Sequence, residues 1–327
     1  MPEQHYPFAV SASVPKPRSR SGEQDARLVE VVPGVHAWLQ PDGTWWLNNA
    51  GAVLGEDGAV LIDTCATAQR TRAFLAAVAE ASADAPLMAA VTTHAHGDHS
   101  HGNALLPPHV PILAHSETRE SILADTVLTS LPPIWAPAPD WGIARHRPPN
   151  VTVDRETTLH TGSRWIEVHH PGHTAHTPGD LIAWLPDERV LFAGDLLFHH
   201  VTPMVLTGSL EGALRSLDWL AAFGAETIVP GHGPLITREE TDTVLDAHAR
   251  YYRAVQRIAR DGRARGLTPL QAARDCDLGE FADWPDQERI VLNLHSAYAD
   301  ADANTVDVIA AFTDAVTFHG GPLHCAL

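Results

Sequence analysis

A cluster of histidines directly after an apolar stretch constrains the fold more than any other feature of this sequence. Residues 86–93 (PLMAAVTT) have the pattern of a buried strand, and the chain continues as His94-Ala95-His96-Gly97-Asp98-His99. With 21 histidines in 327 residues, a chance match to H-x-H-x-D-H is expected roughly 0.006 times. Loops that follow sheet strands are held rigidly and often carry functional groups. The pattern therefore predicts a functional loop at the carboxyl end of a strand.

The residue types in this loop indicate a divalent cation. His94 and His96 are two residues apart and can converge on one ion, while Asp98 and His99 can reach a neighbouring position. Imidazole and carboxylate donors suit zinc and can also hold manganese or iron. Only three cysteines occur, too widely scattered for a thiolate site or a disulfide framework.

Strand and helix patterns alternate on both sides of the histidine cluster. Asp57-Gly58 between two apolar runs predicts a hairpin. Apolar periodicity predicts helices at 67–82, 116–127 and 210–223, and strands at 86–93, 110–114, 165–169, 181–185, 190–192 and 227–229. Two successive halves of this kind predict a layered α/β sandwich.

The sequence divides into three parts. Residues 1–26 are rich in Pro, Ser and Arg without periodicity, so we expect a flexible leader. Residues 27–236 form the expected core domain, with an insert rich in Pro and Trp at 131–149. Residues 237–327 are expected to be a mainly helical extension packed on that domain, where it could cap the sandwich, wall a cleft or form a dimer face.

Three further candidate ligands follow other predicted strands. They are His176 in GHTAHTPGD, Asp195 in VLFAGDLLF and His232 in IVPGHGP. A single histidine is more often a hydrogen-bonded structural residue than a ligand. The common placement of these three at strand ends favours one shared site.

Together, these motifs resemble those of the metallo-β-lactamase-fold hydrolases, and the likeness runs from about residue 28 to 235. It implies a four-layer αββα sandwich with two metal ions. The resemblance implies a first ion held by His94, His96 and His176. It implies a second ion held by Asp98, His99 and His232, with Asp195 bridging the two.

The resemblance also assigns supporting roles. Asp63, at the end of a predicted strand, matches the family's aspartate that supports the metal loop. His173 and His176 both precede a threonine; we prefer His176 as the ligand because His-Thr-Pro-Gly-Asp is followed by the expected strands. His173 is then expected to line the cleft or contact a ligand. Further histidines near the motifs are expected to be hydrogen-bonded or solvated: His101, His169, His170, His199 and His200.

The mechanism implied by this family is hydrolysis at a carbonyl. Two zinc ions, or manganese or iron in their place, would bridge a hydroxide at neutral pH. Asp98 would act catalytically by moving a proton to the leaving group. No serine or cysteine nucleophile is then needed.

Charge and aromatic content narrow the substrate class. The net charge of −18 disfavours nucleic acid and membrane surfaces as partners, and favours a small-molecule substrate. β-Lactams are disfavoured because Leu196-Leu197-Phe198 stands where the family's lactamases place a basic residue. Tryptophans are expected to line an apolar cleft for a flat or aromatic substrate, namely Trp45, Trp46, Trp135 and Trp141.

The chain as a whole is also similar to the second-ring cyclase and thioesterase proteins of bacterial aromatic polyketide biosynthesis. The segments that carry this likeness are QPDGTWWLNNAG, DCDLGEF and GGPLHCAL. It implies a substrate tethered as a thioester to an acyl carrier protein. Because carrier proteins are acidic, this partner requires a local basic patch, with candidates Arg145, Arg147, Arg253, Arg257 and Arg260.

Other interpretations remain open. A lactonase or a glyoxalase II-like hydrolase would use the same metals, although the acidic chain disfavours the anionic glutathione moiety. An iron-binding redox protein on the same fold is a second alternative, and a non-catalytic binding protein a third. The sequence shows neither a secretion signal nor an apolar run of about 20 residues, so we expect a cytoplasmic protein. A second copy of the chain is a candidate partner.

Overall fold

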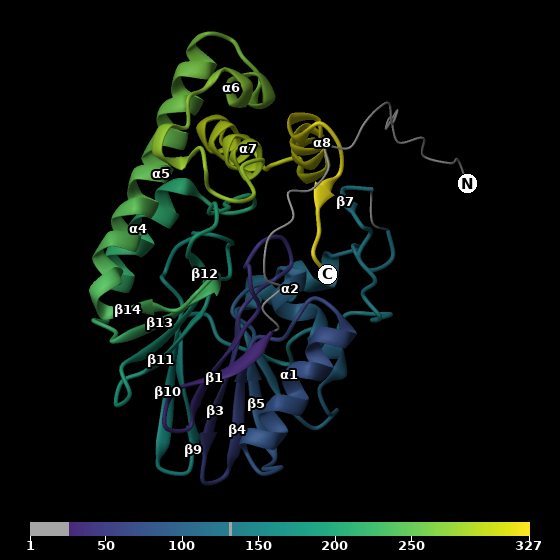
Figure 1. Ribbon diagram of the computed structural model, residues 1–327, viewed down its shortest axis with the longest axis vertical. Coiled ribbons are helices and arrows are strands. Elements are labelled where there is room, and N and C mark those ends of the chain that lie inside the picture. Colours follow the sequence, from purple (N-terminus) through teal and green to yellow (C-terminus); the bar gives the residue numbers. More distant parts are fainter. Residues whose placement is uncertain (1–25, 131–132) are drawn as a thin grey trace.

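The computed structural model describes residues 26–130 and 133–327 (Figure 1). The predicted leader therefore lies, except for Ala26, outside the described residues. Two β-sheets face each other, and helices cover their outer sides. The predicted four-layer α/β sandwich with a helical C-terminal region is thereby confirmed.

The first sheet has the strand order β1-β2-β3-β4-β5-β6-β8. Its strands are β1 (Arg27–Val32), β2 (Val35–Leu39), β3 (Ala50–Gly55), β4 (Gly58–Ile62), β5 (Leu87–Val91), β6 (Ile112–Ala114) and β8 (Val151–Thr152). The second sheet has the order β14-β13-β12-β11-β10-β9. Its strands are β9 (Glu156–Thr161), β10 (Arg164–His169), β11 (Ile182–Leu185), β12 (Val190–Phe198), β13 (Thr227–His232) and β14 (Ile236–Thr237).

Eight helices accompany the sheets in the described residues. They are α1 (Ala68–Ala81), α2 (Gly97–Ser100), α3 (Ser116–Ala124), α4 (Leu210–Ala221), α5 (Arg238–Ala264), α6 (Pro269–Asp275), α7 (Arg289–Asp302) and α8 (Val308–His319). Two 3₁₀ turns complete them, at His101–Leu105 and Gly279–Phe281. No helix among the described residues combines the length and the apolar character needed to cross a membrane.

Side-chain alternation along the strands creates the layers. In β4, Val60 and Ile62 enter the core between the two sheets, whereas Ala59 and Leu61 pack toward α1. Successive side chains of a strand point to opposite faces, so a strand buried on both faces reads as a continuous apolar run. That is why the sequence pattern identified these strands.

The predicted hairpin is present between β3 and β4. Gly55 pairs with Gly58, so the turn consists of Glu56 and Asp57. Gly58 has φ +142°, and a Cβ there would lie 2.2 Å from the carbonyl oxygen of Pro86. Glycine is therefore required at this position both by backbone conformation and by space.

The end of the chain returns to the insert. Within the predicted insert, β7 (Trp135–Ala136) pairs in parallel with β15 (Leu323–His324), and Figure 1 shows the C-terminus beside β7. Leu323 is fully buried, and its N–H donates to the carbonyl of Ile134 at 2.7 Å. The sequence analysis predicted neither strand. The helices α6, α7 and α8 lie beyond one end of the two sheets, next to this pair.

Candidate metal centre

The histidine loop follows β5 and is fixed by Asp63, the residue after β4. The Asp63 carboxylate accepts hydrogen bonds from Thr93 N at 2.7 Å and Thr93 Oγ1 at 2.8 Å. It also lies 2.8 Å from His99 Nδ1. Asp63 has φ +61°, a conformation that is costly for a non-glycine residue. In this conformation the single carboxylate of Asp63 contacts both Thr93, at the start of the loop, and His99, at its end.

A first group of donors gathers three histidines and one aspartate. His96 Nδ1 lies 3.1 Å from His94 Nε2 and 3.0 Å from His176 Nε2. Asp195 Oδ2 lies 3.4 Å from His176 Nε2 and 3.8 Å from His94 Nε2. All four donor atoms fall within 4.8 Å of one another.

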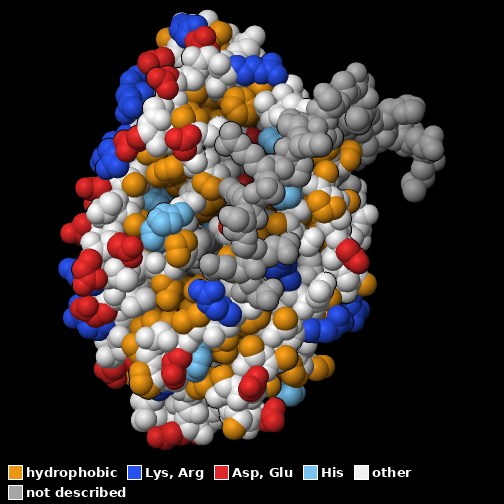
Figure 2. All heavy atoms as spheres, viewed as in Figure 1, with side chains coloured by type: hydrophobic (Ala, Val, Ile, Leu, Met, Phe, Trp, Pro, Cys, Tyr) orange, Lys and Arg blue, Asp and Glu red, His pale blue; other side chains and the backbone are white. Residues whose placement is uncertain are grey.

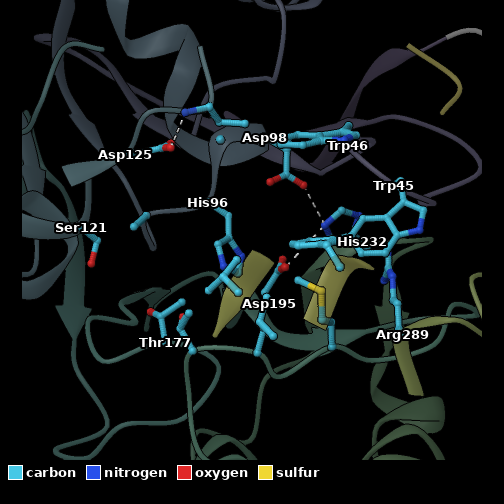
Figure 3. A pocket seen from close by; sticks show the side chains of 18 of the residues that line it. Trp45, Trp46, His96, Asp98, Ser121, Asp125, Thr177, Asp195, His232 and Arg289 are labelled. Atoms are coloured by element: carbon cyan, nitrogen blue, oxygen red, sulfur yellow. Dashed lines mark hydrogen bonds and ion pairs between the residues drawn. The ribbon is translucent and has the colours of Figure 1, made fainter. Parts of the chain in front are cut away.

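A second group adjoins the first through Asp195. His232 Nε2 lies 3.2 Å from Asp98 Oδ2, and His99 Nε2 lies 3.9 Å from the same oxygen. Asp195 Oδ1 lies 3.1 Å from His99 Nε2, while its Oδ2 lies 3.5 Å from His232 Nε2. One carboxylate therefore faces both groups, as Figure 3 shows for Asp98, His232 and Asp195.

Acceptors outside the groups orient the rings. His176 Nδ1 lies 2.7 Å from the carbonyl of Met204, and His232 Nδ1 lies 2.9 Å from that of Gly43. Carbonyl and carboxylate oxygens can only accept, so the Nδ1 atoms of these rings and of His99 carry the proton. Each Nε2 then presents a lone pair to the centre, the arrangement found in histidine metal ligands.

The residues present fit a pair of divalent cations. Donors around one tetrahedral ion with bonds of about 2.0–2.1 Å lie about 3.3 Å apart, close to the separations seen here. Within the described part of the chain, His99 Nε2 and Asp195 Oδ1 are buried without a hydrogen-bond partner although they approach to 3.1 Å. Two buried polar atoms that meet without hydrogen-bond geometry indicate a shared cation.

The pKa shifts within the two donor groups are also consistent with bound cations. Burial lowers the pKa of His176 to about 3, so its ring is neutral. Burial also acts to lower the pKa of His232, but Asp195 and Asp98 outweigh it and raise that pKa to about 9. Two buried carboxylates demand positive charge nearby, which protons or metal ions can supply.

The two groups open into one pocket of about 350 Å³. His96, Asp98, Asp195 and His232 lie on its polar side. The remaining lining is mostly apolar: Trp45, Trp46, Val127, Trp135, Phe198, Met204, Leu206, Val308 and Phe312. Figure 3 shows Trp46 beside Asp98, and Trp45 with Arg289 on the side of His232.

The C-terminal region holds the aromatic wall in place. Trp45 Nε1 donates to Glu288 Oε1 at 2.6 Å. The guanidinium of Arg289 lies 4.6 Å from the centre of the Trp45 ring and 5.6 Å from that of Phe198. Arg289 is fully buried and pairs with Asp286 at 2.8 Å. A cation held over an aromatic face in this way stabilises both partners.

Two predicted site residues lie elsewhere. Trp141 is buried behind the pocket wall, where its ring meets Trp46 edge-on at 4.6 Å; it supports the wall instead of forming it. His173 Nε2 lies 3.0 Å from the carbonyl of Gly212 and 3.1 Å from Ser216 Oγ, so its ring anchors α4. The three other predicted tryptophans line the pocket.

Sequence reasoning missed the pocket residues from outside the motifs. Arg289 and Glu288 lie in an ordinary helix start, DQERIV, and no spacing links them to Trp45, 243 residues away from Glu288. The sequence pattern of the apolar helix α8 predicts that Phe312 is a core residue and gives no sign of the pocket. Asp125 ends α3 without any motif.

The sequence model of the metallo-beta-lactamase superfamily matches residues 43–232. A hydroxyacylglutathione hydrolase from Methylococcus capsulatus is 39% identical over 90 residues, covering 26% of this chain and 33% of the relative. A linear primary-alkylsulfatase from a Pseudomonas species is 27% identical over 229 residues, covering 58% and 42%. The matches thus span less than half the length of these curated relatives.

Solved structures show the same fold. A metallo-beta-lactamase from Pontibacter korlensis superposes with a TM-score of 0.57 at 21% identity, covering 70% of this chain and 99% of the other. An inverting sec-alkylsulfatase from a Pseudomonas species gives a TM-score of 0.62 at 19% identity, covering 87% and 51%.

Proposed function

The chain belongs to the metallo-beta-lactamase superfamily, and on this basis we propose that it is a metal-dependent hydrolase of thioesters or esters with a bulky, apolar acyl group. The observation that carries the proposal is the pocket, in which metal-binding donors occupy one side and aromatic rings the other. A polar reaction centre facing an apolar recess is typical of sites for small apolar substrates.

The two donor groups would hold two divalent ions, with zinc as the commonest for such donors. When bound, these ions supply Lewis acidity and lower the pKa of water, so that hydroxide is available near neutral pH. His94, His96 and His176 would hold one ion and Asp98, His99 and His232 the other, with Asp195 shared.

Asp98 is the chain's own proton carrier in this proposal. It lies on the pocket surface, and its carboxylate reaches within 3.2 Å of His232 Nε2. Burial acts to raise the pKa of Asp98, but His99 and His232 outweigh it and hold that pKa below its usual value. The carboxylate can therefore take up a proton from the attacking water only transiently and pass it to the leaving group.

The aromatic side of the pocket selects the acyl group. The ring of Trp135 meets those of Trp45 and Trp46 edge-on, at 5.9 Å and 5.0 Å between ring centres. They exclude water and offer a flat apolar surface, and 350 Å³ accommodates an aromatic bicycle. An aromatic acyl group is therefore favoured over acetyl.

A carrier-tethered aromatic polyketide thioester is the finer version of this proposal. The aromatic pocket supports it, but one candidate for the basic patch, Arg147, is engaged by backbone carbonyls. Arg147 donates to the carbonyls of Leu106, Pro107, Pro108 and Val110. Figure 2 shows acidic and basic side chains interspersed along the edge formed by α4, α5 and α6. We therefore favour small thioesters over carrier-tethered thioesters as the substrates.

A thioester panel tests the proposal. The zinc-loaded protein should hydrolyse naphthoyl thioesters of N-acetylcysteamine with a kcat/KM at least about tenfold above that for acetyl, since a difference of 1.4 kcal/mol in apolar binding is enough. Trp135→Ala should reduce the preference, whereas the exposed Ile309→Ala should keep it. Equal rates for both acyl groups would exclude the aromatic pocket as the selector, and metal-loaded protein without turnover would exclude the hydrolase.

Sulfate-ester hydrolysis is a second candidate, because the alkylsulfatase structure covers 87% of this chain. A match over 87% of the chain extends beyond residue 237 into the C-terminal region, the part of the chain that supplies Arg289 to the pocket. A buried guanidinium suits a sulfate group. Release of sulfate from octyl sulfate, without cleavage of thioesters, would favour this candidate over the first.

A further inference from the structure

A third set of metal-binding side chains lies outside the two donor groups already described. His101 begins the 3₁₀ turn after α2, Asp125 follows α3, and His146 belongs to the insert that contains β7. One donor atom from each falls within 4.8 Å of the others, and no residue is shared with the first two groups. Three separate segments thus bring metal-binding atoms to one point.

The separations suit a shared ion better than direct hydrogen bonds. Asp125 Oδ2 lies 4.0 Å from His101 Nε2 and 3.6 Å from His146 Nε2. Both distances exceed those of hydrogen bonds. They exceed the roughly 3.3 Å between donors on one tetrahedral ion by about 0.7 Å and 0.3 Å, differences that small side-chain rotations remove.

The tautomer of His101 strengthens this assignment. His101 Nδ1 lies 3.2 Å from the carbonyl oxygen of Ala66. That carbonyl can only accept, so Nδ1 carries the proton in the neutral ring and Nε2 presents a lone pair to the Asp125 carboxylate. Two acceptors that face each other repel unless a cation lies between them. The Ala66 carbonyl is also the kind of outer partner that orients a histidine ligand.

Unsatisfied nitrogen atoms mark the same point. His101 is fully buried, and its Nε2 has no hydrogen-bond partner in the described chain. Both ring nitrogens of His146, whose side chain is 15% exposed, are also buried atoms without a partner there. Buried polar atoms are nearly always satisfied, so the unsatisfied Nε2 atoms of His101 and His146 beside one carboxylate indicate a cation site.

The surrounding structure holds the donors ready. The His101 ring stacks on Trp46 at 5.9 Å and meets Trp141 edge-on at 5.1 Å. A Cβ at Gly97 would lie 2.2 Å from His101 Nε2, so only glycine leaves room for the ring there. Asp125 Oδ1 accepts the N–H of Val127 at 2.8 Å, which turns Oδ2 toward the two rings. The site therefore needs only small side-chain rotations to form.

We propose that His101, Asp125 and His146 bind a further divalent transition-metal ion, such as Zn²⁺, that ties the insert to the histidine loop. Two imidazoles and one carboxylate suit zinc, and leave a position for a further ligand. Asp125 lines the pocket beside the two main donor groups. The ion thus fixes one wall of the pocket while staying separate from the reaction centre.

Zinc stoichiometry tests the proposal directly. Each protein is saturated with Zn²⁺, desalted and measured by elemental analysis. His146→Ala and Asp125→Asn should each contain about one ion per chain fewer than the unsubstituted protein. The matched control His109→Ala removes an exposed histidine from the same region and should lose none. In an Asp195→Asn background, His146→Ala should still remove one ion, which separates this site from the main centre.

A second measurement covers variants that fold poorly. The rise in melting temperature on adding Zn²⁺ to chelator-treated protein should be smaller for His146→Ala and Asp125→Asn than for His109→Ala, since binding to the native state stabilises it. Circular dichroism before addition establishes that the proteins compared are folded. Equal zinc content and equal thermal shifts in His146→Ala and His109→Ala would overturn the proposal.

Discussion

At the scale of single residues, the candidate centre depends on atoms that never face the pocket. Asp63 illustrates this most clearly, because its one carboxylate bonds the loop backbone at Thr93 and the Nδ1 of His99. The Asp195 carboxylate passes so close to Gly231 that a Cβ there would lie 1.9 Å from its Oδ1. Such contacts set where donor atoms lie, and donor placement decides affinity for a cation.

Removing the carboxylate of Asp63 should therefore weaken metal binding without removing a ligand. In Asp63→Asn, the amide cannot accept from every partner at once, and the His99 ring loses its fixed orientation. We expect zinc affinity to fall by about 10- to 100-fold, measured by competition with a chelating dye. Asp84→Asn, at an exposed site, is the control. Unchanged affinity in Asp63→Asn would show that the loop alone positions His99.

At the scale of elements, sequence patterns predicted what local periodicity determines. The helices over 67–82 and 210–223 appear as α1 and α4, and the strands of both sheet centres appear within a few residues. Thr67 caps α1 with its side chain, a signal that lies in the sequence itself. The candidate ligands were also found in this way, because each follows a predicted strand.

The elements that sequence analysis missed depend on long-range partners. β7 and β15 have two residues each and exist only because they pair across 188 positions, from Trp135 to Leu323. β9 alternates half-buried and exposed side chains at the edge of its sheet, so its apolar signal is weak. The third histidine set was missed for the same reason, since His101 and His146 meet only through the folded insert.

The contact between α5 and β12 makes a prediction about pH. His248 on α5 accepts the N–H of Phe198 at its Nε2 and lies 2.9 Å from the carbonyl of Val244 at its Nδ1. Burial lowers its pKa to about 4, whereas the unfolded chain has the ordinary value of about 6.5. Between these values the unfolded state binds more protons, so falling pH removes stability.

The free energy of unfolding should therefore decline more steeply in the unsubstituted protein than in His248→Gln between about pH 6.5 and 4. The difference should reach about 3 kcal/mol at the acid end. Urea unfolding of metal-free protein at several pH values measures it, and titration of the remaining histidines cancels in the comparison. Parallel pH profiles would mean that His248 titrates normally in the folded protein.

At the scale of the whole molecule, the reaction side and the recognition side of the pocket come from different parts of the chain. The metal donors all precede residue 233, whereas Glu288, Arg289 and Phe312 follow it. The aromatic wall is therefore shared between the sheets and the C-terminal helices. Trp45 is the residue through which the two parts meet, because it contacts all three of those side chains.

The bond between Trp45 and Glu288 should couple the two parts energetically. It is short, at 2.6 Å, largely buried and charge-assisted, and bonds of this kind contribute about 1.5–3 kcal/mol. A double-mutant cycle with Trp45→Phe and Glu288→Ala isolates this term, because each change removes one partner. The free energies of unfolding of the four proteins should be non-additive by about 1–3 kcal/mol. If the two effects simply add, the C-terminal helices pack on the sandwich without depending on this bond, and Arg289 over the Trp45 ring becomes the contact that holds the wall.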